Sequence, residues 1–265
     1  MDLHLKDKVV VVTGASTGIG RAIALEYLAE GCKVVVCART QANLDTLVEE
    51  CRGKGYKDIV AMRADVAEPG DHQMLLEKTV AAFGGLNIWV NNAGIAARVD
   101  LINATIADWD RSMNINLRAT FLGSQAAARY MKEHGGGVIV NASSIVTRIP
   151  SAGTGIYAIS KWGVSAFTQV MAAEMAPYNI RVFAFAPGLI STEMTQKRIN
   201  ADRKGQESQI ALNRTGTPEE IAPAVVMLSS ERSGYFTGAT IEISGGKFCV
   251  QNPHYGWDKL AAEEK

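Results

Sequence analysis

Thr13-Gly14-Ala15-Ser16-Thr17-Gly18-Ile19-Gly20 is the stretch that decides the fold of this 265-residue chain. It follows the apolar run at residues 9–13 directly and opens a segment of helical character that continues to Leu28. Glycines at a strand–helix junction allow a tight turn, and they let backbone N–H groups approach a pyrophosphate at the positive end of the helix. The spacing GxxxGxG is a variant of the dinucleotide-binding fingerprint. The stretch therefore predicts a nucleotide-binding βα unit.

The rest of the chain repeats this βα rhythm. Short apolar, β-branched runs alternate with helical patterns, and they fall at residues 9–13, 33–38, 59–64, 88–90, 138–141, 180–186 and 239–243. Strands that are apolar on both faces belong to parallel sheets with helices packed on each side. The pattern predicts an α/β chain with a three-layer doubly wound Rossmann fold, a central parallel sheet of about seven strands, and a single domain over residues 1–265.

Two segments depart from the βα rhythm. Residues 189–216 are polar and rich in Lys, Arg and Gln, and they follow the sixth predicted strand. Ligands of open α/β sheets bind beyond the carboxyl ends of the strands, so this segment is predicted to be a substrate lid; a solvated surface helix is the alternative. Residues 247–265 form a C-terminal extension with three aromatic residues, which favours docking, hypothetically across a neighbouring subunit.

Composition excludes several classes of partner. The 27 basic residues balance 27 acidic ones, which argues against nucleic acid and membrane surfaces as partners. No stretch approaches the ~18 continuous apolar residues of a membrane span, and the N-terminus lacks a secretory pattern, so a cytoplasmic protein is expected. The four cysteines, at positions 32, 37, 51 and 249, have no metal-binding spacing, and we expect reduced thiols and no metal site.

Residues 157–176 form a predicted helix that is apolar nearly all round. A helix that is hydrophobic on every side must be covered on every side. One face can pack on the sheet and leave a second face for another subunit, which predicts a homo-oligomer, either a tetramer or a dimer. A deep core position within a monomer is the alternative.

The pair Tyr157 and Lys161 is the strongest chemical signal, because residues at i and i+4 are neighbours on a helix surface. A nearby ammonium favours the phenolate and lowers the pKa of a tyrosine, so the phenol can serve as a general acid/base. Tyr255 and Lys259 show the same spacing in a Pro- and Gly-punctuated tail. Only the first pair has polar side chains nearby in the sequence, because Asn141-Ala142-Ser143-Ser144 lies just upstream of Tyr157.

Further motifs complete the pattern. They are Asp65-Val66, Asn91-Asn92-Ala93-Gly94, Asn116, Ser144, Pro187-Gly188 with Thr192, and the closing Ser244-Gly245-Gly246. Together with the glycine stretch and the Tyr–Lys pair, they occur in the order typical of one family. From residue 8 to 246 the chain resembles the short-chain dehydrogenase/reductases, in particular their 3-oxoacyl reductase-like members.

The resemblance implies where a dinucleotide binds. Asp65 and Val66 are expected to hold the adenine, Asn91 to Gly94 to support the central strand near the ribose, and Thr192 to meet the nicotinamide carboxamide. The remaining cofactor positions implied by the resemblance are Gly14, Ser16, Thr17, Gly18, Ile19, Gly20, Ala93, Pro187, Gly188 and Ile190, joined by Tyr157 and Lys161. Taken alone, Asp65 is also a helix cap and the asparagines an ordinary strand-end turn.

The end of the second predicted strand bears on cofactor choice. An acidic residue there would bind the ribose hydroxyls and repel a 2′-phosphate, but the sequence has Ala38 followed by Arg39. A guanidinium suits a 2′-phosphate, so NADP(H) is predicted rather than NAD(H). Thr17 departs from relatives that carry a second basic residue, and a solvated strand-end charge is the alternative for Arg39.

The resemblance also assigns catalytic roles. Tyr157 is the proton donor, and Ser144 hydrogen-bonds the same substrate oxygen. Lys161 favours the tyrosinate and grips the nicotinamide ribose, and Asn116 helps to hold a water for proton relay. Ser143 and Asn114 are adjacent competitors that fit the family spacing less well.

The predicted reaction is hydride transfer between nicotinamide and a ketone or secondary alcohol, with a 3-oxoacyl thioester, a sugar or polyol, or a steroid-like compound as substrate. A non-catalytic dinucleotide-binding sensor or scaffold is the alternative. Arg98 and Arg148 are candidates for an anion site at the pocket mouth; exposed arginines at loop ends that contact only water are the alternative. The charges of the lid, at positions 197, 198, 203 and 204, suit either an acidic carrier protein or simple solubility.

Overall fold

Seven parallel strands form one sheet in the order β3-β2-β1-β4-β5-β6-β7. The computed structural model describes residues 2–263. The strands are β1 (Val9–Thr13), β2 (Lys33–Ala38), β3 (Ile59–Arg63), β4 (Ile88–Asn91), β5 (Gly137–Ala142), β6 (Ile180–Pro187) and β7 (Thr240–Ile243). The predicted doubly wound parallel sheet is confirmed, and its winding reverses between β1 and β4. Ligands bind at such a switch point.

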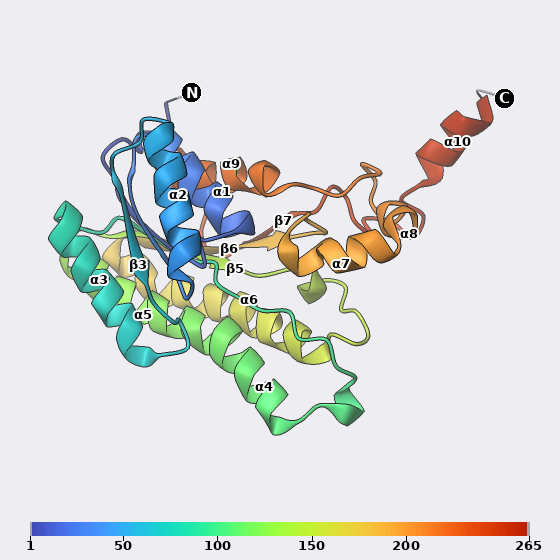
Figure 1. The fold of residues 1–265 in the computed structure, drawn as a ribbon, viewed down its shortest axis with the longest axis horizontal. Helices are drawn as coiled ribbons and strands as arrows, with labels where there is room; N and C mark the ends of the chain where they lie inside the picture. The colour runs from blue at the N-terminus through green and yellow to red at the C-terminus, as the bar shows by residue number, and fades with distance from the viewer. Residues whose placement is uncertain (1, 264–265) are drawn as a thin grey trace.

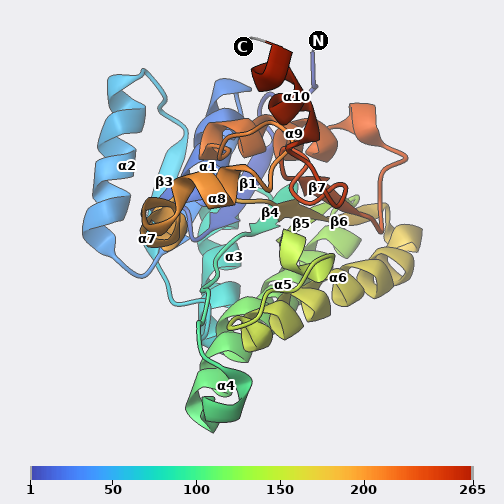
Figure 2. The same cartoon turned by 90° about the vertical axis from the view of Figure 1, so that its right-hand side faces the viewer.

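Helices cover both faces of the sheet (Figures 1 and 2). Helices α1 (Gly18–Ala29), α2 (Gln41–Gly53) and α9 (Pro218–Ser229) contribute to one hydrophobic cluster with the strands. Helices α3 (Pro69–Phe83), α5 (Ala119–Glu133) and α6 (Gly155–Met175) contribute to a second cluster on the opposite face. The two clusters are the two interfaces of a three-layer fold.

The alternation within β1 shows why the apolar runs become strands. Val10 and Val12 belong to one cluster, whereas Val11 belongs to the other, and all three are fully buried. Successive side chains of a strand point to opposite faces, so a continuous apolar run is stable only when both faces are covered.

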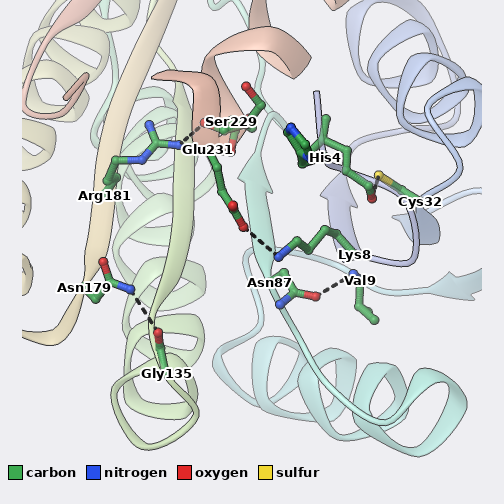
Figure 3. A network of polar contacts seen from close by, with 12 residues as sticks. His4, Lys8, Val9, Cys32, Asn87, Gly135, Asn179, Arg181, Ser229 and Glu231 are labelled. Carbon is green, nitrogen blue, oxygen red and sulfur yellow. Dashed lines mark hydrogen bonds and ion pairs between the residues drawn. The ribbon is translucent and has the colours of Figure 1, made fainter. Parts of the chain in front are cut away.

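Polar contacts tie the amino ends of the strands together (Figure 3). Arg181, at the start of β6, donates four hydrogen bonds to backbone carbonyls that end or follow α9, those of residues 228, 229, 230 and 236. Lys8 pairs with Glu231 at 3.0 Å, and the Asn87 side chain accepts a hydrogen bond from the backbone of Val9. This edge lies opposite the carboxyl ends of the strands, where the cavity lies.

The remaining elements lie outside the sheet and the six helices that cover its faces. They are α4 (Ile106–Met113), a π-helical turn (Asn114–Arg118), α7 (Glu193–Ala201), α8 (Arg203–Glu207), α10 (Tyr255–Glu263), and short 3-10 turns at Leu101–Asn103, Ile145–Thr147, Ala176–Tyr178 and Glu231–Ser233. Helices α7 and α8 occupy the predicted lid segment, and α10 projects away from the body (Figure 1). Within residues 2–263, no helix combines the length and apolarity needed to cross a membrane.

Candidate active site and cofactor cleft

The glycine turn after β1 is held by close backbone approaches. Gly14 and Gly18 have φ of 63° and 57°, a left-handed region that glycine adopts without steric cost. A Cβ on Gly14 would lie 2.7 Å from Cα of Ala93, and one on Gly20 would lie 2.3 Å from Nδ2 of Asn92. The turn therefore packs directly against the strand-end segment after β4.

Asn92 locks these two segments together from the other side. Its amide nitrogen donates to the carbonyls of Thr13 (3.0 Å) and Gly14 (3.1 Å). The Thr13 hydroxyl in turn accepts hydrogen bonds from the backbone N–H groups of Asn92 and Ala93. The sequence analysis missed this bracing role of Thr13, because only the fold brings residues 79 positions apart into contact.

One cavity of about 430 Å³ runs along the carboxyl ends of the strands. Its lining includes every residue predicted to contact the cofactor, together with Ser144, Tyr157 and Lys161. Asn116 is not part of the lining. The lining residues that the sequence analysis left out include Ile115, Ala142, Phe185 and residues 193–195, the first turn of α7. The lid segment thus forms part of the cavity wall.

The end of the cavity next to β2 is basic. Arg39 is exposed, and its backbone carbonyl accepts a hydrogen bond from the guanidinium of Arg63 at 3.2 Å. No ion pair of Arg39 occurs within residues 2–263. Asp65 caps a turn, since its carboxylate accepts from the backbone N–H of Ala67 at 3.0 Å, and it still lines the cavity.

Ser144, Tyr157 and Lys161 converge from two elements. Ser144 follows β5, and the other two lie in the first turns of α6. The neighbouring Ser143 points elsewhere: its hydroxyl hydrogen-bonds that of Ser165 on α6 at 2.8 Å. The Ser144 hydroxyl accepts a long 3.4 Å contact from the backbone N–H of Val146, and it is also a hydrogen-bond partner of the Tyr157 side chain, whose pKa it lowers.

Burial dominates the titration of the Tyr–Lys pair. It raises the pKa of Tyr157, an effect that the Ser144 hydroxyl partly offsets, and it lowers the pKa of Lys161 to about 8. The expectation that Lys161 lowers the tyrosine pKa is wrong for this structure. The reason is that desolvation penalises both charged forms, while the ammonium donates to the carbonyl of Ala142 at 2.7 Å. Tyr157 is therefore a neutral phenol at neutral pH.

Asn116 lies behind the cavity and holds neighbouring segments together by hydrogen bonds. It is fully buried in the π-helical turn, a kind of helix defect that is frequent at functional sites. Its side chain exchanges two hydrogen bonds with the backbone of Ile95, at 2.8 and 2.9 Å, and donates to the Ser160 hydroxyl at 3.0 Å. A Cβ on Gly94 would lie 3.2 Å from Oδ1 of Asn116 and 3.4 Å from Nζ of Lys161, so the asparagine and the lysine flank one glycine.

Arg148 does not serve as the free anion site that its position suggested. Its guanidinium pairs with Glu242 on β7 at 2.6 Å and donates to the carbonyls of Lys247 (2.6 Å) and Phe248 (3.0 Å). The side chain instead holds the start of the C-terminal extension against the loop after Ser144. Further along, Trp257 donates to the carbonyl of Ala211 at 2.8 Å, which attaches α10 to the lid segment.

The cavity fits a dinucleotide on steric grounds. The glycine turn lines the cavity and presents backbone N–H groups at the start of α1, and a Cβ at Gly14 or Gly20 would collide with Ala93 or Asn92 and displace the turn. No group of three or more His, Cys, Asp or Glu side chains within residues 2–263 is arranged to hold a metal ion.

Comparisons with known proteins agree with this geometry. The family model of the short chain dehydrogenases matches residues 8–203. The 3-oxoacyl-(acyl-carrier-protein) reductase FabG of Thermotoga maritima is 39% identical, covering 92% of this chain and 99% of its own. The (3R)-3-hydroxyacyl-CoA dehydrogenase of Rattus norvegicus is also 39% identical, covering 93% and 98%. The structure of a short-chain type dehydrogenase/reductase from Mycobacterium marinum, 36% identical, superposes with a TM-score of 0.89 over 94% of this chain and 98% of its own. The chain belongs to the short-chain dehydrogenases and is an oxidoreductase that acts on CH–OH groups.

Proposed function

We propose that this protein is an NADP(H)-dependent reductase of ketones that works through Ser144, Tyr157 and Lys161. The observation that carries the proposal is the meeting of these three side chains in the same cavity as the glycine turn. A dinucleotide bound there supplies the hydride. A pure sensor would need the glycine turn but none of the proton chemistry.

The titration state of Tyr157 suits the reductive direction. A phenol whose pKa is raised by burial keeps its proton at neutral pH and can donate it to a substrate oxygen as negative charge develops there. The Ser144 hydroxyl is a hydrogen-bond partner of Tyr157 and can donate to the same oxygen when a substrate binds. Lys161, with a pKa of about 8, carries a charge at neutral pH and can hold the tyrosinate that remains.

The preference for NADP(H) is supported by charge at the β2 end of the cavity. Arg39 lines the cavity there, and Ala38 leaves no carboxylate to repel a 2′-phosphate. Arg63 of β3, whose guanidinium donates to the backbone carbonyl of Arg39, is a candidate for the second basic group that the sequence analysis did not find at Thr17.

We also propose a cytoplasmic homo-oligomer. The outer face of α6 exposes an apolar stripe that consists of Ile159, Trp162 and Val170. Phe121 of α5, the helix next to α6 on the same face of the sheet, is also exposed. An exposed apolar patch of this kind is typical of a protein interface.

The proposal is tested by following NADPH and, separately, NADH at the absorbance of the reduced nicotinamide. The substrate panel consists of acetoacetyl thioesters, diketones, keto-sugars and oxo-steroids. We expect oxidation of NADPH with at least one substrate class, and a loss of about 10²–10⁴-fold in kcat for Tyr157→Phe, the usual contribution of a general acid. Equal rates for the variant and the natural protein would contradict the proposal.

A further inference from the structure

The turn between β3 and α3 is held by two consecutive side chains of α3. The carboxylate of Asp71 accepts a hydrogen bond from the backbone N–H of Asp65 at 2.7 Å. Nε2 of His72 lies 2.9 Å from the backbone carbonyl oxygen of Val66. Consecutive residues of the helix thus fix consecutive residues of the turn.

His72 is a buried donor of fixed tautomer. Only 3% of its surface is exposed. A carbonyl oxygen can only accept a hydrogen bond, so Nε2 of the imidazole carries the proton. Burial lowers the pKa of His72, which keeps the ring neutral at neutral pH. The imidazole therefore donates one hydrogen bond to the Val66 carbonyl and carries no charge.

The packing around His72 leaves the ring little freedom to move. Its centroid lies 6.5 Å from that of Trp89 on β4. A Cβ on Gly123 of α5 would lie 3.2 Å from Nδ1 of His72 and 2.8 Å from Nε1 of Trp89, so an alanine there would press on both rings. The Trp89 indole is held in turn, because its N–H donates to the Asn91 side chain at 2.8 Å. Two elements besides α3 thus fix the position of the imidazole.

The turn leaves two groups without protein partners beside the cavity, whose lining includes Asp65 and Val66. The backbone N–H of Val66 donates to no group within residues 2–263. In the same part of the chain, only one oxygen of the Asp65 carboxylate has a hydrogen-bond partner, the N–H of Ala67. A donor next to an acceptor matches the edge of an adenine, where N1 accepts and the 6-amino group donates.

The two hydrogen bonds from α3 orient the free N–H. They hold the peptide group before Asp65 and the one after Val66, and the peptide between these two carries the Val66 N–H. The Val66 carbonyl does not need a buried histidine for its own sake, because Val66 is only half-buried at the cavity, where water can satisfy a carbonyl. What the imidazole adds is a fixed orientation of the turn.

We propose that Asp71 and His72 are positioning residues for the cofactor. Through the turn, they direct the Val66 N–H and the Asp65 carboxylate at the edge of the adenine. This inference rests on the proposed function, because the adenine belongs to the dinucleotide. Hypoxanthine has the opposite edge, with a proton on N1 and a carbonyl in place of the amino group. It would set donor against donor and carbonyl against carboxylate, so discrimination between the two bases measures how firmly the turn is held.

The test uses whichever of NADPH and NADH the natural protein binds more tightly, together with the hypoxanthine analogue of that dinucleotide. Isothermal titration gives both dissociation constants. We expect the natural protein to bind the adenine form at least about tenfold more tightly. His72→Phe keeps a ring of similar size but removes the donor. It should weaken binding of the adenine form about three- to tenfold, the size of one hydrogen bond, and change binding of the analogue less than about twofold.

Asp71→Ala should reduce the discrimination in the same direction, and it carries the test if His72→Phe does not fold. Two conservative variants are expected to restore the preference for adenine. His72→Gln retains an N–H donor, and Asp71→Asn retains a carbonyl acceptor. In steady-state assays, His72→Phe should raise the KM for the dinucleotide and leave kcat within about twofold, because neither residue touches the reacting groups.

Thr79→Val is the matched control. Thr79 is fully buried on the same helix, and its hydroxyl donates to the carbonyl of Leu75 at 2.7 Å, within α3. The substitution should lower the melting temperature and leave the discrimination unchanged. An equal loss of discrimination in Thr79→Val, or an equal loss of affinity for both dinucleotides in His72→Phe, would overturn the positioning role. Circular dichroism and thermal melting verify that each variant is folded.

The titrations keep the two proposals separable. If the natural protein binds a dinucleotide but reduces no ketone, the reductase fails, and the dissociation constants still decide the roles of Asp71 and His72. If ketones are reduced and the discrimination is equal in the natural protein and the variants, the positioning role fails alone. Equal binding of the adenine and hypoxanthine forms by the natural protein also overturns it alone. Absence of binding of both NADPH and NADH overturns both proposals.

Discussion

Lys161 links the chemistry of the site to the stability of the fold. Its pKa is lowered from 10.5 to about 8 because burial penalises the ammonium. A folded-state pKa below the unfolded one means that the unfolded chain binds more protons between these two values, so this group makes stability rise with pH across that window. The site residue thus lowers stability at neutral pH.

We therefore expect the free energy of unfolding of the natural protein, minus that of Lys161→Met, to rise between pH 8 and pH 10.5, by at most about 1.4 kcal/mol per pH unit. Urea unfolding of both proteins without cofactor measures the difference. Taking a difference removes the contributions of other groups, such as the buried thiols of Cys32 and Cys37, whose raised pKa values act in the opposite direction. A flat or falling difference would show that the lysine is not desolvated.

Arg39 is the residue that decides cofactor choice in our proposal. Arg39→Asp replaces an attraction for the 2′-phosphate by a like-charge contact, which costs several kcal/mol, so the ratio of kcat/KM for NADPH to that for NADH should fall by about 100-fold or more. Steady-state rates with both cofactors measure the ratio. Arg63→Ala should lower the ratio in the same direction by less. An unchanged ratio in Arg39→Asp would refute the assignment.

The sequence predicted some residues of the site well because their signals are local. The helical spacing of Tyr157 and Lys161 and the strand–turn–helix context of the glycines need no tertiary information. Thr13 lacked such a signal, because its hydrogen-bond partner Asn92 lies 79 positions away. Desolvation, which reversed the expected pKa shift of Tyr157, is likewise a property of the folded state.

At the scale of elements, the Arg148 side chain holds the start of the C-terminal extension in place. Arg148→Ala removes the pair with Glu242 and two hydrogen bonds to the backbone of residues 247 and 248. We expect a loss of about 1–3 kcal/mol in the free energy of unfolding, the usual cost of leaving such groups without partners. Urea denaturation provides the measurement.

Arg203→Ala is the control for this prediction, since it breaks an ion pair of half-exposed i,i+4 residues on α8, and such pairs contribute only about 0.3–0.5 kcal/mol. An equal effect of the two substitutions would mean that Arg148 is only a surface charge. The sequence analysis named Arg148 as a candidate for an anion site because the sequence does not reveal its pairing with Glu242, which lies 94 positions later.

Strand bounds shifted by at most one residue at either end between the sequence analysis and the structure, because runs that are buried on both faces leave little freedom of register. Helix bounds were less regular. The helix expected at residues 157–176 begins at Gly155 and ends at Met175. The π-helical turn at Asn114–Arg118 was not expected. Asn116 within it donates hydrogen bonds to Ile95 and Ser160, partners that only the folded chain brings together.

At the scale of the whole molecule, the apolar stripe on α6 predicts assembly. Trp162 and Val170 are 55% and 58% exposed on one helix face. The double substitution Trp162→Glu and Val170→Glu should shift the sedimentation coefficient toward that of a monomer, because charges in an apolar interface are desolvated without partners. Tyr235→Glu, at a fully exposed position outside the stripe, is the control. A monomeric natural protein, or an unaltered assembly of the double variant, would contradict the proposal.

The contacts of Arg181 and Lys8 at the amino ends of the strands have a consequence for how such a chain can diversify. The contacts of Arg181 and Lys8 stabilise one edge of the sheet, whereas the segments after Gly94 and in α7 lie at the other edge, beside the cavity. Substitutions in these segments can change substrate preference without removing the contacts of Arg181 and Lys8 that stabilise the fold. Substrate preference and stability can therefore change independently, because they depend on residues at opposite edges of the sheet.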